Sequence, residues 1–364
     1  MSYAVKKVSD GGEIVIVGNY VYEDKGSVGV KGKTITISGG TLDLSSTTEF
    51  NINGSVVLKD IIVKANDNGS IFANGNSFTV EESVAFNGRL GHLYGGSKQV
   101  AQKSTHMVIK SGNYREIYGG GLQAGIEGDT YLFVGGNVNK GIDVFANEHK
   151  EALDYCIYGG SYSHVVSGNT KVVFDGKDAV AGYVYGSGRG VYAYVKGTSS
   201  VEMRNGTVYS IYGGVCEKSE YASRSTSTEV KMYGGKVAQI FGGSGSSNLV
   251  GSTHVEIFGG NVTRRIYGGC YNDYSLGWAS TENHVVGTTR VILHDEATYG
   301  SEESDNAICA TSRWKSNLDE EVATLEIETE ALYNTLSKRL KVFGTTLSSG
   351  VTGYDSLIVA GQPK

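Results

Sequence analysis

Apolar and polar residues alternate in short segments along this chain, and this alternation is its clearest structural signal. In TEVKM (228–232) and THVEI (253–257), a Thr is followed by apolar residues at every second position. A period of two is typical of a β-strand that buries one face. A Gly-Gly or Asp-Gly pair follows, where glycine accepts the positive φ of a tight corner. A second segment of the form V-x-x-I-Y ends at another Gly-Gly pair, so each phrase predicts two short strands.

The same phrase recurs along the chain with changes in detail. Related segments begin at Thr105, Thr170, Ser199, Thr228 and Thr253, and a shortened one begins at Thr289. The aromatic residue before the second glycine corner is assigned to Tyr94, Tyr118, Phe145, Tyr185, Tyr212, Phe241 and Tyr267, with Tyr158 as an extra one in a longer insertion. From Tyr158 onward the spacings are 27, 27, 29 and 26 residues, which predicts a recurring structural unit.

A two-strand unit of about 27 residues cannot bury its apolar face alone, whereas stacked units bury one continuous core. Helical repeats are excluded because the units contain glycine pairs and β-branched alternation. A β-propeller would need four strands in about 40–50 residues. The predicted fold class is therefore all-β: a single-stranded right-handed parallel β-helix, or β-solenoid, with repeats of about 27 residues and long loops on one edge.

The whole chain, residues 1–364, is predicted to form one β-helix domain in three parts. Residues 12–90 alternate but lack the Tyr-Gly-Gly corner, which predicts shorter turns; residues 91–300 hold the Tyr-Gly-Gly repeats; residues 301–364 contain further turns. In 331–341, three leucines at i, i+4 and i+8 leave a short helix as an open alternative. The N-terminus lacks a signal-peptide pattern. The last residues read as an uncapped strand, which favours a truncated piece of a longer protein.

Two resemblances rest on these patterns. The opening turns resemble the right-handed parallel β-helix superfamily that includes pectin- and pectate-lyase-like proteins. The Tyr-Gly-Gly phrases at 105–120, 199–214, 228–243 and 253–269 are similar to repeats of large bacterial surface and autotransporter-like proteins. The second resemblance implies a secreted or cell-surface location and a role in adhesion or glycan contact, and it identifies no catalytic residue.

Composition removes several other classes. The chain has 53 Gly and a single Pro among 364 residues, which excludes a collagen-like protein and a Pro-rich linker. With 19% charged residues and a net charge of −6, nucleic acid is not an expected partner. No apolar run reaches the roughly 18–20 residues of a membrane span, so membrane insertion is not expected. The widely spaced Cys156, Cys216, Cys270 and Cys309 are predicted to be free thiols.

Known active-site motifs of β-helix enzymes are missing. Pectate lyases use an Asp cluster that binds calcium and an Arg base in R-x-P-x-x-R, and the only proline here is Pro363. The polygalacturonase motifs N-T-D, D-D, G-H-G and R-I-K do not occur either. A glycoside hydrolase or polysaccharide lyase stays as the alternative function, with Asp273, Asp295 and Glu303 as its candidate carboxylates. No cofactor is predicted, although the acidic group at 295–305 could hold Ca²⁺.

The segments that return the chain to each new unit are rich in aromatic and charged residues. Aromatic rings next to polar side chains are suited to carbohydrate, because rings pack on sugar C–H faces and polar groups bind hydroxyls. The predicted ligand-binding residues are Tyr162, His164, Arg189, Tyr192, Tyr221, Arg224, Tyr271, Asp273, Tyr274, Trp278 and Trp314. The predicted function is a bacterial surface β-solenoid that binds glycan or a host protein through these loops without catalysis.

The position of the corner tyrosines is left open. Each follows an inward-facing Ile by one residue, so strict alternation would turn its ring outward, as a platform for sugar rings or a partner. Corners break alternation, so the rings could instead stack inside the core.

Overall fold

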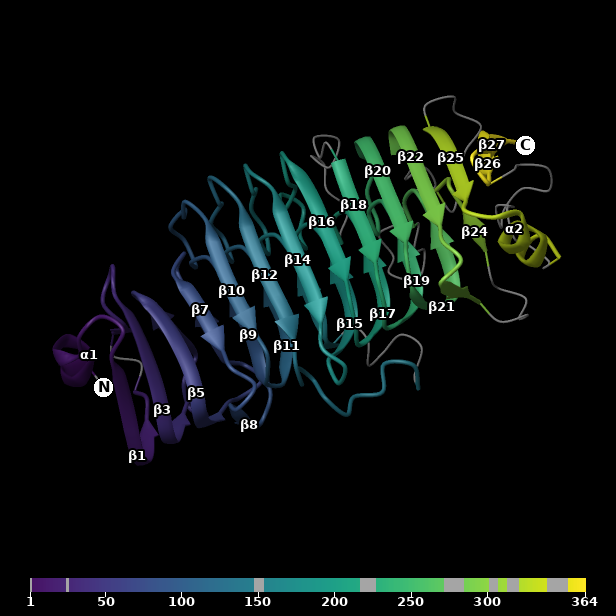
Figure 1. Ribbon diagram of the computed structural model, residues 1–364. Helices are drawn as coiled ribbons and strands as arrows, with labels where there is room; N and C mark the ends of the chain where they lie inside the picture. The colour runs from purple at the N-terminus through teal and green to yellow at the C-terminus, as the bar shows by residue number, and fades with distance from the viewer. Residues whose placement is uncertain are drawn as a thin grey trace.

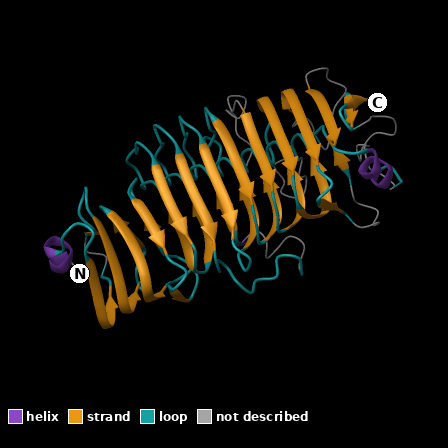
Figure 2. Cartoon of the chain, viewed as in Figure 1, coloured by secondary structure: helices purple, strands orange, loops and turns teal. Residues whose placement is uncertain are grey.

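The computed structural model describes residues 2–23, 26–146, 154–216, 227–271, 285–300, 307–312, 321–338 and 353–364. Within these ranges the protein is elongated and all-β, with strands side by side along one axis from the N-terminal to the C-terminal end (Figure 1). The helices of the described residues are short and lie at the two ends (Figure 2).

The described strands form two long sheets. Sheet A contains, in spatial order, β1 (Glu13–Val21), β3 (Thr34–Asp43), β5 (Ser55–Lys64), β7 (Ser77–Val80), β10 (Thr105–Ile109), β12 (Thr130–Gly135), β14 (Thr170–Asp175), β16 (Thr198–Met203), β18 (Ser227–Met232), β20 (Leu249–Ile257), β22 (Val285–Leu293), β25 (Glu321–Ile327), β26 (Ser356–Val359) and β27 (Gln362–Pro363), with β8 (Ala85–Asn87) also beside β5. Sheet B contains β2 (Ser27–Val28), β4 (Glu49–Ile52), β6 (Ser70–Phe72), β9 (Leu90–Tyr94), β11 (Tyr114–Tyr118), β13 (Cys156–Tyr158), β15 (Val180–Tyr185), β17 (Thr207–Tyr212), β19 (Lys236–Phe241), β21 (Gly260–Tyr267) and β23 (Ala297–Tyr299), with β24 (Ile308–Cys309) beside β21.

The chain alternates between the two sheets, and neighbouring strands are parallel throughout the described residues except for the pair β26–β27. The register brings the first residues of the predicted phrases opposite one another: Thr105 pairs with Thr130, Thr130 with Thr170, and Thr170 with Ser199. Further along, Ser199 pairs with Thr228 and Thr228 with Thr253. The all-β class and the predicted stacking of parallel strands are confirmed.

Inward-facing apolar residues of both sheets form the main core. In β16 and β18 half-buried and buried positions alternate strictly, with Val201, Met203, Val230 and Met232 on the buried face. This is the pattern that the period of two predicts. Sheet B contributes residues such as Ile211 to the same core.

Both helices close the ends of this core. Val5 of α1 (Ser2–Lys7) and Leu336 of α2 (Glu330–Leu336) are buried in it. The structure therefore decides the open alternative near residue 331 in favour of a helix, which Thr329 caps by accepting a hydrogen bond from the Leu332 amide. The sequence analysis missed α1, because a single turn or two leaves no readable period.

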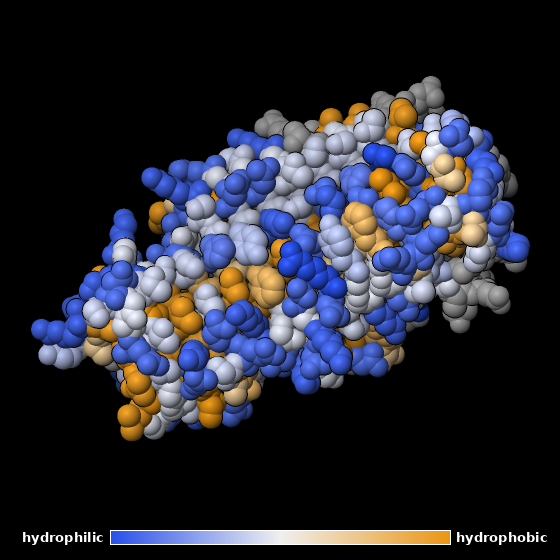
Figure 3. Space-filling model, viewed as in Figure 1, coloured by the Kyte–Doolittle hydropathy of each residue, from blue (hydrophilic) through white to orange (hydrophobic). Residues whose placement is uncertain are grey.

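The N-terminal edge of sheet A is apolar on its outer side. Apolar side chains gather there (Figure 3), and Val15, Val17 and Val21 of β1 are exposed, Val17 by 93%. Among the described strands β1 pairs only with β3.

A glycine, the carbonyl of the glycine in the next turn and a threonine hydroxyl meet at the corner where sheet B leads back to sheet A. From Gly95 to Gly242, the first glycine after each corner aromatic residue lies against the carbonyl of the equivalent glycine in the next turn: a Cβ on Gly213 would lie 2.2 Å from the Gly242 oxygen. That carbonyl turns away from the strand ladder and accepts a hydrogen bond from the hydroxyl of Thr228, at 2.5 Å. In the same way, the hydroxyls of Thr130 and Thr170 donate hydrogen bonds to the carbonyls of Gly159 and Gly186, both at 2.6 Å. The glycine of the predicted phrase thus allows the close approach at the corner, and the threonine supplies the hydrogen bond that the buried carbonyl needs.

We expect Thr228→Val to destabilise the protein by about 1–3 kcal/mol, because a buried carbonyl loses its donor while the side-chain shape is kept. Denaturant unfolding at equilibrium measures the change. Thr207→Val is the matched control, since Thr207 begins the neighbouring β17 half-buried and its hydroxyl has no hydrogen bond within the described part of the chain. Equal stability of the two variants would contradict this role for the corner hydroxyl.

We also expect Gly213→Ala to cost about 1–3 kcal/mol, because the new methyl group would overlap the Gly242 carbonyl. Gly125→Ala is the control: its Cβ would come no closer than 3.1 Å to the Val165 oxygen. Thermal unfolding of both variants makes the comparison. A Gly213→Ala protein as stable as the control would mean that the turns can separate at this corner.

Candidate functional site

The corner aromatic residues form one continuous column on sheet B. Phe72, Tyr94, Tyr118, Tyr158, Tyr185, Tyr212, Phe241 and Tyr267 stack in this order, with centroids of successive rings 4.6–5.5 Å apart and planes within 12°. Tyr158 is thus a regular member, and the assignment of Phe145 to the series is wrong. Phe145 lies in the segment after β12 and meets the ring of Tyr209, which is outside the column, edge to face at 6.0 Å.

The column faces away from the main core, yet it is buried. Ile117 belongs to the main core, whereas its neighbour Tyr118 belongs to a separate cluster. Outward alternation is therefore correct for these rings. Loop residues such as Leu122 and Tyr162 cover the cluster, and each ring of the column is at most 5% exposed. A buried column cannot serve as an open platform for sugar rings.

Three of the predicted ligand-binding residues belong to this cover. Tyr162 meets Tyr118 edge to face at 5.7 Å, and the Arg189 guanidinium lies 5.4 Å above the Tyr162 ring. Tyr271 is buried, and its ring centroid lies 4.5 Å from that of Phe241. The sequence places these side chains correctly in the return loops, and the structure brings Tyr162 and Arg189 together.

Arg189 also forms an ion pair with Glu116, a carboxylate of sheet B that the sequence analysis did not single out. Glu116 is 6% exposed, accepts a hydrogen bond from the Tyr118 hydroxyl at 2.9 Å, and lies 3.2 Å from His92 Nε2. Burial opposes ionisation, but His92 and the charge of Arg189 outweigh it and lower the pKa of Glu116. This ion pair joins the covering loop to a strand 73 residues earlier.

The other predicted site residues are not gathered at one place by the described structure. His164 and Tyr192 are exposed loop residues, and Asp295 is exposed and accepts a hydrogen bond from the Thr329 hydroxyl at 2.9 Å. Outside the described residues lie Tyr221, Arg224, Asp273, Tyr274, Trp278, Glu303 and Trp314. Within the described residues, no three His, Cys, Asp or Glu side chains are placed to hold a metal ion.

A hollow among the described residues lies at the N-terminal end of the series of long loops. The connections β4–β5 and β6–β7 are tight corners at 53–54 and 73–76, but the connection β9–β10 runs from 95 to 104. This first long loop rises beside the short corners and leaves a groove of about 890 Å³. We call it the amide groove; it is lined by Ser27, Lys31, Asn51, Ile52, Asn53, Asn74, Gly75, Asn76, Ser97, Val100, Ala101, Gln102, Lys103 and Ser104.

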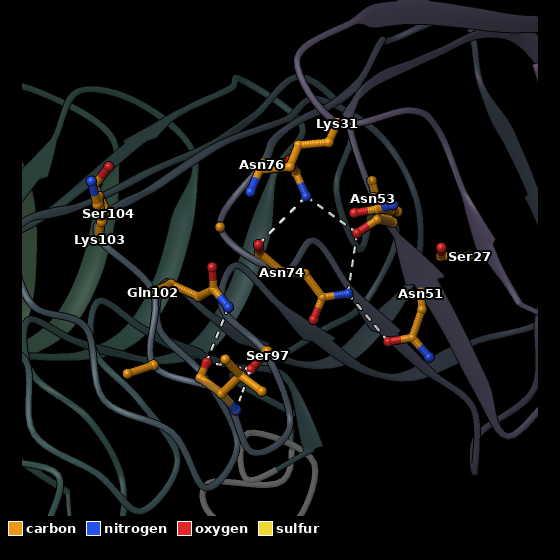
Figure 4. Close-up of a pocket in the computed structure, with 14 residues that line it drawn as sticks. Ser27, Lys31, Asn51, Asn53, Asn74, Asn76, Ser97, Gln102, Lys103 and Ser104 are labelled. Atoms are coloured by element: carbon orange, nitrogen blue, oxygen red, sulfur yellow. Dashed lines mark hydrogen bonds between the residues drawn. The ribbon is translucent and has the colours of Figure 1, made fainter. Parts of the chain in front are cut away.

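Two asparagines of the groove are fixed by the backbone. Asn74 Nδ2 donates to the Ile52 carbonyl at 3.1 Å and to Asn51 Oδ1 at 3.2 Å (Figure 4). Asn76 Nδ2 donates to the Ala73 carbonyl at 2.8 Å. Their side-chain oxygens have no hydrogen bond within the described residues. The groove is thus lined by acceptors whose orientation is already set.

The local sequence explains this geometry. Asn74 and Gly75 both have positive φ, 53° and 77°, and the Asn76 amide donates to the Ala73 carbonyl at 3.0 Å. This is a tight turn of the kind that Asn-Gly favours. In Figure 4 the asparagines lie on one side of the groove, and Ser97 and Gln102 lie on the other.

Sequence reasoning missed the groove because it searched for aromatic and charged loops. A signal was present: Asn-x-Asn occurs at 51–53 and again at 74–76, one turn later. The register pairs Asn51 with Phe72, two residues before Asn74, and the Asn74 amide reaches Asn51 Oδ1 in the neighbouring turn at 3.2 Å.

No protein-family model, curated protein or solved structure matches this chain. The two resemblances drawn from the sequence pattern therefore stay hypotheses. None of the described helices is long and apolar enough to cross a membrane.

We expect Glu116→Gln to lower the free energy of unfolding by about 1–3 kcal/mol at pH 7, because Arg189 loses its charged partner. A carboxylate with a lowered pKa stabilises the fold above its usual value of 4.5, and the contribution is lost as the pH falls through the pKa of the folded state. The difference between the two proteins should therefore shrink from pH 7 to pH 3. The exposed Glu127→Gln is the control, and a difference that is unchanged at pH 3 would assign the effect to packing.

Proposed function

We propose that the protein is a non-catalytic β-solenoid of a bacterial surface that binds a carbohydrate chain in the amide groove. The observation that carries this proposal is the set of oriented side-chain oxygens of Asn74 and Asn76 in an open groove of about 890 Å³. Sugar hydroxyls donate and accept hydrogen bonds, and amide and hydroxyl side chains can act as the acceptor or the donor for them.

Preorganisation supports binding at this place. The amide nitrogens of Asn74 and Asn76 are held by backbone carbonyls of the tight corners, so ligand binding does not need to order them. Ser97 is held as well, since its hydroxyl accepts from the Val100 amide at 2.8 Å. A groove whose polar groups are fixed before binding loses little conformational entropy on complex formation.

Binding without cleavage fits the lining of the groove. Glycoside hydrolysis uses two carboxyl groups on either side of the bond, and the groove lining contains no Asp or Glu. The alternative of a hydrolase or lyase would use Asp273, Asp295 and Glu303, of which only Asp295 lies in the described structure. No described contact joins Asp295 to the groove.

The proposal also includes the finer architecture expected from sequence. The two sheets would belong to one right-handed coil with a repeat of about 27 residues, and the long loops would leave it on one edge. Glycan or a host protein bound by the aromatic loops would then be a second contact on the same surface. The secreted or cell-surface location is part of this proposal.

The test is binding of the purified protein to a panel of neutral and acidic glycans, with product release read from the same wells. We expect retention of a glycan without release. Ala101→Trp, which places a large side chain in the groove, should reduce affinity by about tenfold or more. Asn53→Ala should reduce it about threefold to tenfold, the value of one or two hydrogen bonds.

Asn68→Ala is the matched control, because Asn68 is an exposed asparagine outside the groove. It should bind as the unchanged protein does. If no glycan is retained, or if Ala101→Trp binds as well as the unchanged protein, the groove is not the binding site. Release of oligosaccharide would show that the protein cleaves the glycan, and the proposal of binding without catalysis would be wrong.

A further inference from the structure

Charge is distributed unevenly between the amide groove and the rest of the protein. The chain has a net charge of −6, yet the charged residues of the groove lining are Lys31 and Lys103, with no Asp or Glu. Both lysines are exposed. Within the described residues neither has an ion-pair partner.

Other lysines near the groove are engaged. Lys98 pairs with Glu49, and the Lys33 ammonium donates to the Val8 carbonyl at 3.1 Å. The positive charge that stays without a partner is therefore that of Lys31 and Lys103, the two that line the hollow. Like charges at one concave surface raise the local concentration of anions.

Lys31 lies in the connection β2–β3 and Lys103 in the loop 95–104; in Figure 4 they are well apart, with Lys31 beside Asn76 and Lys103 beside Ser104. A ligand that meets both needs more than one acidic group, separated by a stretch that carries hydroxyls. We propose that the groove binds an anionic polysaccharide, with acidic groups at Lys31 and Lys103 and sugar hydroxyls at the amides. This inference rests on the proposed function and adds the class of glycan.

The chemistry at the two lysines fixes the charge of the ligand. An ammonium group acts as a point charge, whereas an arginine fork selects planar carboxylates through two parallel hydrogen bonds. The groove lining contains no Arg. Sulfate esters and carboxylates on a sugar therefore share the required chemistry, and the experiment separates them.

Three polymers with one backbone make the test: dextran, dextran sulfate and carboxymethyl dextran of matched length. Affinities are measured for the unchanged protein, for Lys31→Gln/Lys103→Gln, and for a control with Lys6→Gln/Lys177→Gln. Lys6 and Lys177 are exposed lysines outside the groove. The control keeps the same net charge as the groove variant.

We expect at least one charged dextran to bind about tenfold more tightly than dextran at low salt, and the advantage to fall with ionic strength. The groove variant should lose this advantage and the control should keep it. A preference for dextran sulfate identifies sulfate esters, and a preference for carboxymethyl dextran identifies carboxylates.

Two results would overturn the inference alone. In the first, a glycan from the panel binds the groove, but neutral and charged polymers bind equally well. In the second, the groove variant and the control lose the same amount, which assigns the binding to general surface charge. Retention of no polysaccharide of any kind would overturn the proposed function as well.

Discussion

The contact between successive turns at the glycine corner is the constraint on which the rest of the structure depends. Parallel strands of neighbouring turns must lie at sheet distance along their whole length, and at the corner this leaves no room for a Cβ between Gly213 and the Gly242 carbonyl. The close approach leaves that carbonyl outside the strand ladder, and the Thr228 hydroxyl satisfies it. The glycine allows the close approach and the threonine satisfies the carbonyl, so the two residues are needed together at each corner of this kind.

The same register determines what happens on the outer face of sheet B. Once the corners are aligned, the aromatic residue before each glycine must stack on its equivalent, as Tyr118 does on Tyr158 at 4.6 Å. A column of this kind exposes a long apolar surface unless it is covered. Polar contacts hold the covering loops in place, and the ion pair of Arg189 with Glu116 reaches two turns back, from the loop after β15 to β11. The loops thus bury the aromatic column from the outer side of sheet B, in addition to any role in binding.

The sequence was sufficient to predict what depends on local period and corner chemistry. Alternation in segments such as 228–232 predicts the buried faces of sheet A, and the Thr-to-glycine phrase predicts parallel stacking. It was insufficient where the outcome depends on contacts between distant residues. Whether Tyr118 is open or covered depends on Tyr162, and the ionisation of Glu116 depends on Arg189. Phe145 was misassigned because spacing alone cannot tell a strand end from a covering loop.

The amide groove follows from a change in connection length and not from any unusual residue. Short corners at 53–54 and 73–76 give way to the loop at 95–104, and a step between short and long connections on a rigid stack must leave a hollow. Its lining is polar because tight corners select Asn and Gly for their backbone conformations. The same residues that make the turns therefore present oriented amides to a ligand. A binding surface of this kind can arise from turn chemistry alone, which is why a search for aromatic loops passed over it.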